Sequence, residues 1–185
     1  MLDKTYEKVP VELKPLRANV FSLVFSVVFF LAALLFYGSG GAISFSVDIS
    51  DVLLFLLLMI AGIVVHEALH GVGFWCGRKT AWKDIHFGVV WSKLIVYASC
   101  EKPISVAHYR FAVVLPTIAL GLVPFLLAYF SQSLFWYMWG IFMIIGSCGD
   151  FIILWTLRRY KKGTLIADSL DRIGYDAFVP RERTM

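Results

Sequence analysis

Long apolar runs, separated by short polar segments, make up most of the chain. Four of them approach the ~20 residues that a helix needs to cross the hydrocarbon core of a bilayer, and they cover residues 20–37, 52–75, 111–130 and 134–157. In lipid the backbone must satisfy its own hydrogen bonds, so runs of this length predict helices. The first run could instead be a cleaved signal peptide, but it is longer than the ~7–15 apolar residues of a usual signal. We therefore expect an all-α polytopic membrane protein with four transmembrane helices.

The segment between the second and third runs, residues 76–110, has a different pattern. Residues 85–90 and 94–98 are rich in β-branched and aromatic side chains and flank a short polar stretch, which is typical of a β-hairpin. An isolated hairpin is only marginally stable in water. We therefore expect this one to pack on the helices or at the membrane interface.

The same pattern divides the chain into three parts. We interpret residues 1–19 as an extended N-terminal segment, residues 20–157 as the membrane domain and residues 158–185 as a short polar tail. Within the third run, Pro116 and Pro124 remove backbone donors and favour a bend. Transmembrane helices also tolerate proline without a special purpose, and this alternative stays open.

Composition and charge agree with a membrane protein. Hydrophobic residues make up 59% of the chain and charged residues 16%, and the mean hydropathy is +0.78. All 17 Lys and Arg lie before the first run, between the second and third, or after the fourth. By the positive-inside rule these segments, including both termini, are cytoplasmic, and we expect an integral multi-pass protein of the plasma membrane.

The charge also bears on partners and on redox state. Contact with anionic lipid of the bilayer explains the net charge of +4, so no nucleic-acid partner is expected. Cys76, Cys100 and Cys148 lie on or near the cytoplasmic side, where disulfides do not form. Their spacing is not that of a cysteine metal site.

Candidate chemistry lies within the second run, at His66-Glu67-Ala68-Leu69-His70. In a helix, His66 and His70 lie one turn apart on one face and can bind one metal ion together. In this pattern the imidazoles hold Zn²⁺, and Glu67 takes a proton from the water that attacks a carbonyl. The alternative is a pair of buried histidines that hydrogen bonds satisfy. Ionisable residues inside a membrane are costly and usually functional, which favours the metal interpretation.

A third ligand is expected, because a catalytic zinc usually has three protein ligands. Outside the motif, the ionisable side chain deep in a predicted span is Asp150. His66 follows Val52 by 14 residues, or ~21 Å of helix, and Asp150 follows Leu134 by 16 residues, or ~24 Å. The two spans run in the same direction, so the similar depths predict a His₂Asp site. Asp150 could instead pair with Arg110 for packing.

Other polar residues of the 76–110 loop are weaker candidates. His86 and His108 are surface histidines by position, although either could orient a ligand or stabilise an oxyanion. Glu101, Tyr97 and Tyr109 are no more specific and stay outside the predicted site.

These motifs resemble a known group of enzymes. A membrane-embedded His66-Glu67-Ala68-Leu69-His70, a β-rich segment after it and a distant Asp150 are similar to the core of the site-2 proteases, which are intramembrane zinc metalloproteases. The small size and the Ser147-Cys148-Gly149-Asp150 context are more similar still to a zincin-peptidase family of small membrane proteins, domain of unknown function 3267. The resemblance covers about residues 50–160. It implies that His66, His70 and Asp150 bind one Zn²⁺ per chain and that Glu67 is the catalytic base. The chain departs from the site-2 proteases in the residues that flank Asp150, and no asparagine follows Asn19 to assist an oxyanion.

The sequence therefore predicts a zinc-dependent, membrane-embedded peptidase that hydrolyses a peptide bond of a membrane protein or peptide, within or near the membrane. The hairpin could supply an edge to which an extended substrate strand adds. Two alternatives are a non-enzymatic protein that binds or transports divalent metal and an inactive protease-like scaffold. Glu67 separates them, because hydrolysis needs a base beside the ligands and transport does not. The substrate, the oligomeric state and the oxyanion-stabilising residue stay open.

Overall fold

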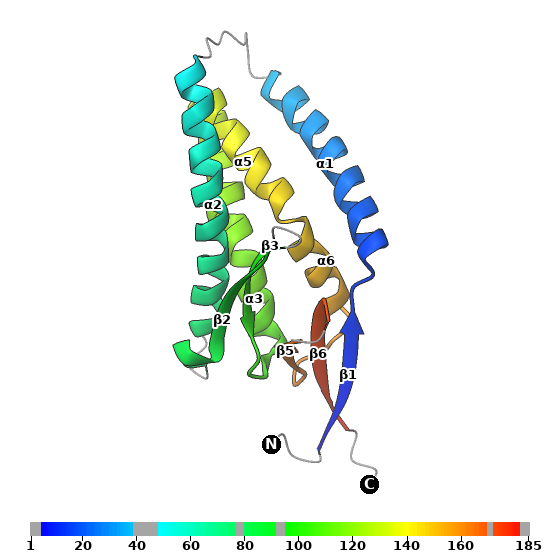
Figure 1. The fold of residues 1–185 in the computed structure, drawn as a ribbon. Coiled ribbons are helices and arrows are strands. Elements are labelled where there is room, and N and C mark those ends of the chain that lie inside the picture. The colour runs from blue at the N-terminus through cyan, green and yellow to red at the C-terminus, as the bar shows by residue number, and fades with distance from the viewer. Residues whose placement is uncertain (1–4, 39–47, 77–79, 92–94, 170–171, 182–185) are drawn as a thin grey trace. The chain divides into compact units, whose positions relative to one another are not determined.

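The computed structural model describes residues 5–38, 48–76, 80–91, 95–169 and 172–181. The expected hairpin turn at residues 92–94 and the connector at residues 39–47 lie outside the described residues. The chain divides into two compact units, and Figure 1 follows its elements from the N-terminus to the C-terminus. The helical unit comprises residues 15–66 and 116–149, and the sheet unit comprises residues 1–14, 67–115 and 150–185.

Apolar helices make up the helical unit. They are α1 (Pro15–Gly38), most of α2 (Ile49–Trp75), the π-helix η2 (Thr117–Leu122), α4 (Val123–Phe130) and α5 (Leu134–Gly146). Large apolar side chains remain exposed along α1 and α2, which is the expected surface of helices that face lipid. A buried cluster joins α1, α4 and α5, and it consists of Ala33, Tyr37, Ala128, Tyr137 and Ile141.

Three helical stretches are long and apolar enough to cross a membrane, namely Pro15–Gly38, Ile49–Trp75 and Val106–Phe130. Helices α5 and α6 (Cys148–Leu157) are separated by a break at Ser147, and together they would make a fourth. The structure is therefore compatible with a membrane protein of three to four spans.

The third stretch is not one regular α-helix. The π-helix η2 separates α3 (Val106–Pro116) from α4, with Pro116 as the last residue of α3 and Pro124 in the first turn of α4. A π-helical turn leaves the regular backbone ladder disturbed. The indole N–H of Trp139 donates to the Leu120 carbonyl at 3.0 Å and so satisfies an acceptor of this segment. Pro116 and Pro124 thus flank the π-helical segment.

The sheet unit contains two antiparallel sheets. The larger has the strand order β1 (Tyr6–Glu12), β6 (Gly174–Pro180), β5 (Leu165–Asp168) and β4 (Ile104–Ser105). The smaller pairs β2 (Ile85–Val90), which follows the short helix η1 (Trp82–Asp84), with β3 (Ile95–Cys100). The antiparallel pairing of β2 with β3 agrees with the strands of the predicted hairpin.

The larger sheet corrects the all-α expectation, which allowed for β structure only in the hairpin. β1 belongs to the N-terminal segment and pairs with β6 of the tail, with Tyr6 opposite Pro180 and Glu12 opposite Gly174. Pro10 weakens the strand pattern of β1, and it is tolerated because β1 lies at an edge of the sheet. The partners lie at opposite ends of the chain, so neither segment alone predicts the pairing.

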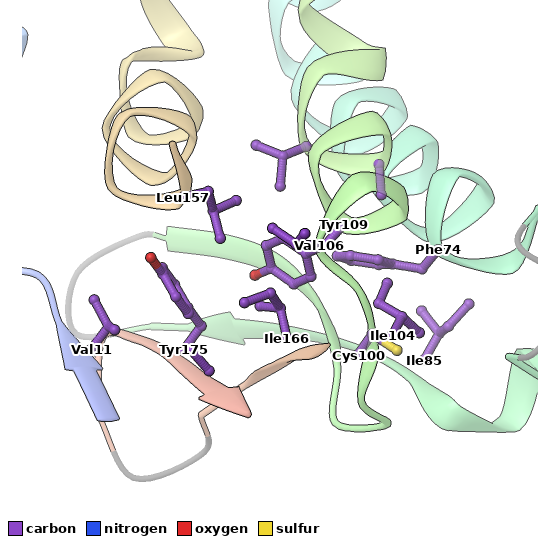
Figure 2. Packing of buried hydrophobic residues seen from close by; sticks show 13 residues of the cluster. Val11, Phe74, Ile85, Cys100, Ile104, Val106, Tyr109, Leu157, Ile166 and Tyr175 are labelled. Atoms are coloured by element: carbon purple, nitrogen blue, oxygen red, sulfur yellow. The ribbon is translucent and has the colours of Figure 1, made fainter. Parts of the chain in front are cut away.

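One hydrophobic core connects the strands of the sheet unit with the adjacent ends of its helices (Figure 2). Tyr109 of α3, Leu157 of α6, Ile166 of β5 and Tyr175 of β6 are buried in it. Cys100 at the end of β3 lies in the same core and is fully buried. The core therefore holds β3, β5 and α3 in fixed positions, and each of these elements contributes to the candidate site.

Candidate metal centre

Helix α2 carries three of the predicted site residues, His66, Glu67 and His70. Each offers one ligand atom, and these atoms all lie within 4.8 Å of one another. His70 is buried, whereas His66 and Glu67 are partly buried. The local helix thus brings these three side chains together, as their spacing predicts, in a group that could hold a metal ion.

A backbone carbonyl of α3 orients the His70 imidazole. His70 Nδ1 lies 3.0 Å from the Ala112 carbonyl oxygen. A carbonyl oxygen can only accept, so Nδ1 carries the proton of this hydrogen bond. In the neutral ring Nε2 then carries the lone pair, which is the form that a metal ion needs.

This hydrogen bond depends on a close approach of α2 and α3 at Gly73. A Cβ atom added to Gly73 would lie 2.6 Å from Ala112 Cα and 3.0 Å from Ala112 Cβ. Small residues at a helix contact allow the two backbones to come this close. Gly73 therefore permits the approach that brings the Ala112 carbonyl to His70.

Asp150, in the first turn of α6, contacts the other nitrogen of the same imidazole. Its Oδ1 atom lies 3.3 Å from His70 Nε2, and both side chains are largely buried. Two ligands of one tetrahedral zinc, each at ~2.0–2.1 Å from the ion, lie ~3.3–3.4 Å apart. The observed distance therefore fits a shared metal ion, and it also fits a hydrogen-bonded ion pair. Among the described residues, the mutually close group consists of His66, Glu67 and His70, and Asp150 joins it through His70.

Arg110, which was considered as a partner of Asp150, binds backbone carbonyls at the end of α6. Its guanidinium donates to the Leu157 carbonyl at 2.6 Å and to the Tyr160 carbonyl at 3.0 Å, at the C-terminal end of α6. A cation there complements the negative end of the helix dipole. The described contact of Asp150 is with His70, and the alternative pairing of Asp150 with Arg110 stays a prediction.

Glu67 contacts the hairpin. The Ala98 N–H of β3 donates to Glu67 Oε2 at 2.8 Å. The hairpin thus lies beside the motif, in agreement with its expected packing on the helices. This bond holds the carboxylate in one direction at the edge of β3.

Asp168 is part of the same surroundings and was missed by sequence reasoning. It is the last residue of β5, and its Oδ2 atom accepts from the Cys100 N–H of β3 at 2.7 Å. Its Oδ1 atom accepts from the Tyr109 hydroxyl of α3. Burial raises the pKa of Asp168 to about 6, and the hydrogen bonds from Tyr109 and Cys100 work in the opposite direction. An acid at the end of the apolar run Leu165-Ile166-Ala167 is the signal that could have marked it.

The two loop histidines have other partners. His86 Nε2 lies 3.4 Å from Glu101 Oε1 in an exposed pair. His108 Nε2 lies 3.1 Å from the Phe74 carbonyl and so binds the last turn of α2. The described contacts of both histidines are therefore with groups other than His66, Glu67 and His70.

The protein is mostly helical, has apolar helices long enough to cross a membrane, and carries a candidate metal centre on one of them. These features define its class. A family model described as "Putative zincin peptidase", domain of unknown function 3267, matches residues 59–165, which is more than half of the chain. The chain belongs to this family. The family name supports a zinc peptidase.

An "Uncharacterized 24.7 kDa protein in gap 5'region" of Pyrococcus woesei is 28% identical over 121 residues, which are 64% of this chain and 53% of the relative. The chain thus spans about half the length of this curated relative. No solved structure matches the chain.

Proposed function

We propose that the protein is a zinc-dependent, membrane-embedded peptidase of the site-2-protease type, in which His66, His70 and Asp150 hold one Zn²⁺ per chain. The observation that carries the proposal is the arrangement around His70. Its Nδ1 proton is bound by the Ala112 carbonyl, and its Nε2 atom lies at the separation of a shared tetrahedral ligand from Asp150. The nitrogen and oxygen donors of this set are those that zinc takes in catalytic sites.

Glu67 is the base of the proposed reaction. Bound at the site, Zn²⁺ supplies Lewis acidity, which polarises a peptide carbonyl and acidifies water. The Glu67 carboxylate accepts the proton of the attacking water and returns it to the leaving amine. The Ala98 N–H donates to Glu67 Oε2 at 2.8 Å and so helps to orient the carboxylate of the proposed base.

The substrate is a membrane protein or peptide. Carbonyls of a transmembrane helix are already bonded within the helix, so the substrate must unwind before attack. The free edge of β3 is a poor place for a long substrate strand, because its N–H groups at Ala98 and Cys100 already bind Glu67 and Asp168. We therefore propose local unwinding at the site, without extended strand addition along β3.

The sheets support a four-span topology. β4 precedes the third candidate span and pairs with β5, which follows α6. Paired strands lie on the same side of a membrane, so an even number of crossings must separate β4 from β5. We propose that Val106–Phe130 supplies one crossing and that the broken pair α5 and α6 supplies the other. The pairing of β1 with β6 likewise favours both termini on one side, which we take as the cytoplasmic side of the plasma membrane from the positive-inside rule.

The test is zinc content and cleavage on the purified full-length protein. We expect about one zinc per chain in the wild type, loss of zinc in Asp150→Ala and His70→Ala, and retention in Glu67→Gln and in the exposed-histidine control His86→Ala. Cleavage is followed by mass spectrometry on single-span membrane peptides in proteoliposomes. Glu67→Gln should lower it by ~10²-fold or more. Absence of zinc from the wild type, or cleavage that survives in Glu67→Gln, would overturn the proposal. Zinc flux that survives in Glu67→Gln would instead identify a transporter.

A further inference from the structure

The outer edge of β3 is bound by two carboxylates from different elements. Ala98 and Cys100 lie two residues apart, so their N–H groups point to the same side of the strand, away from β2. Glu67 of α2 accepts the first at 2.8 Å and Asp168 of β5 accepts the second at 2.7 Å. The strand is therefore tied on one edge to the candidate base and to a second acid.

Asp168 is in turn held by α3. The Tyr109 hydroxyl donates to Asp168 Oδ1, and Tyr109 precedes Ala112 by three residues, so both lie on one face of α3. Ala112 supplies the carbonyl that binds His70. One face of α3 thus reaches both the candidate ligand His70 and, through Asp168 and β3, the candidate base Glu67.

We propose that Asp168 is a positioning residue for Glu67. Together with Tyr109 it fixes β3 at the place from which the Ala98 N–H holds the Glu67 carboxylate. The proposal rests on the proposed function for the role of Glu67 as base. We call the hydrogen bonds from Tyr109 to Asp168, from Cys100 to Asp168 and from Ala98 to Glu67 the hydrogen-bonded frame. This frame does not depend on a bound metal ion.

The chemistry of the carboxyl group sets this role apart from simple packing. Each oxygen of Asp168 takes one donor, and Tyr109 OH is both a donor and an acceptor. An asparagine at position 168 can therefore accept from Cys100 N–H through Oδ1 and donate to the Tyr109 oxygen through Nδ2. Alanine can do neither, so Asp168→Asn should preserve the position of β3 and Asp168→Ala should release it.

The test measures amide hydrogen exchange by NMR on the full-length protein in nanodiscs, labelled with ¹⁵N at alanine and cysteine. In Asp168→Ala we expect exchange at both Cys100 and Ala98 to rise about tenfold, which corresponds to the loss of one hydrogen bond at each amide. In Asp168→Asn we expect both rates within about threefold of the wild type. Glu67→Ala is the matched control, and it should raise exchange at Ala98 but not at Cys100.

Two outcomes would overturn the proposal. One is faster exchange at Cys100 in Asp168→Ala with Ala98 unchanged, which would make Asp168 a local support of β3 only. The other is failure of Asp168→Asn to restore the Ala98 rate. If Asp168→Ala does not fold, Tyr109→Phe serves in its place, because it removes one donor and leaves the Cys100 bond; it must still raise exchange at Ala98.

This experiment separates the proposal from the proposed function. The exchange rates report the link from Asp168 to Ala98 whether or not zinc binds. Zinc absent from the wild type would refute the peptidase and leave the exchange result to decide the frame. Zinc present, with Ala98 insensitive to position 168, would refute the frame alone. Once a cleaved peptide is known, Asp168→Ala should lower kcat with zinc retained, and Asp168→Asn should restore it.

Discussion

Substitution of Gly73 by alanine tests the geometry around His70 without touching a candidate ligand. The added Cβ would lie 2.6 Å from Ala112 Cα, whereas carbon atoms in good contact are ~3.5–4.0 Å apart. The contact can relax only if α2 and α3 separate locally by about 1 Å. The hydrogen bond from His70 Nδ1 to the Ala112 carbonyl, now 3.0 Å, would then exceed the ~3.2 Å limit of ordinary N–H···O bonds.

The expected result is a folded protein that binds zinc more weakly. Loss of the partner that orients a metal-binding histidine typically costs 10–100-fold in affinity, or about 1.4–2.7 kcal/mol. Alanine favours a helix over glycine by up to about 1 kcal/mol, so the change in local propensity acts in the opposite direction and cannot cause the loss.

The assay is competition for zinc between the purified protein and a chromogenic chelator. Gly146→Ala is the matched control, because it makes the same chemical change in a helix where an added Cβ meets no atom within 4 Å. Wild-type affinity in a folded Gly73→Ala protein would refute the argument that the Ala112 carbonyl prepares His70. An equal loss in Gly146→Ala would refute it as well, because it would show a general effect of glycine replacement.

Two further predictions concern stability. Burial raises the pKa of Asp168 from 3.8 to about 6, so the folded state binds this proton more tightly than the unfolded state does. The protonated group therefore adds to the free energy of unfolding below about pH 4. This contribution, at most roughly 3 kcal/mol, is lost as the pH rises to about 6. Thermal melts in detergent should show this decline in the wild type and a flatter profile in Asp168→Asn, and identical profiles would contradict the assignment. In the helical unit, Tyr137→Phe removes the hydrogen bond of 2.8 Å from Tyr137 of α5 to the buried Ala33 carbonyl of α1. This change should lower the unfolding free energy by about 1–3 kcal/mol. Tyr6→Phe on the edge strand β1 is the control, and it should leave the melt unchanged.

The hydrophobic pattern predicts the membrane-length helices well, because a span must be apolar along its whole length. It fails for the larger sheet. β1 pairs with β6 across more than 160 residues of sequence, from Tyr6 opposite Pro180 to Glu12 opposite Gly174. Such distant pairing leaves no signal in either segment. Residues 1–19 and 158–185 therefore read as polar ends although both carry strands.

The candidate site, like the fold, could be predicted from the sequence only in part. The sequence singles out His66, His70 and Asp150 as candidate ligands, because ionisable side chains are costly inside a membrane span and few residues share that property. The depth comparison places Asp150 near the level of the motif, and the structure brings it to 3.3 Å from His70. The sequence could not identify the groups that orient His70 and Glu67. These groups are the backbone carbonyl of Ala112 and the backbone N–H of Ala98.

Backbone groups are present at every position, so only the fold decides which of them meets a functional side chain. Here that choice rests on ordinary residues, above all on Gly73, whose lack of a side chain lets α3 approach His70. Asp168 differs from these backbone groups because it is a side chain. We propose that it positions β3, and burial raises its pKa to about 6. Where a partly buried acid binds a strand beside a candidate base, its hydrogen bonds must offset the desolvation that the carboxyl group requires.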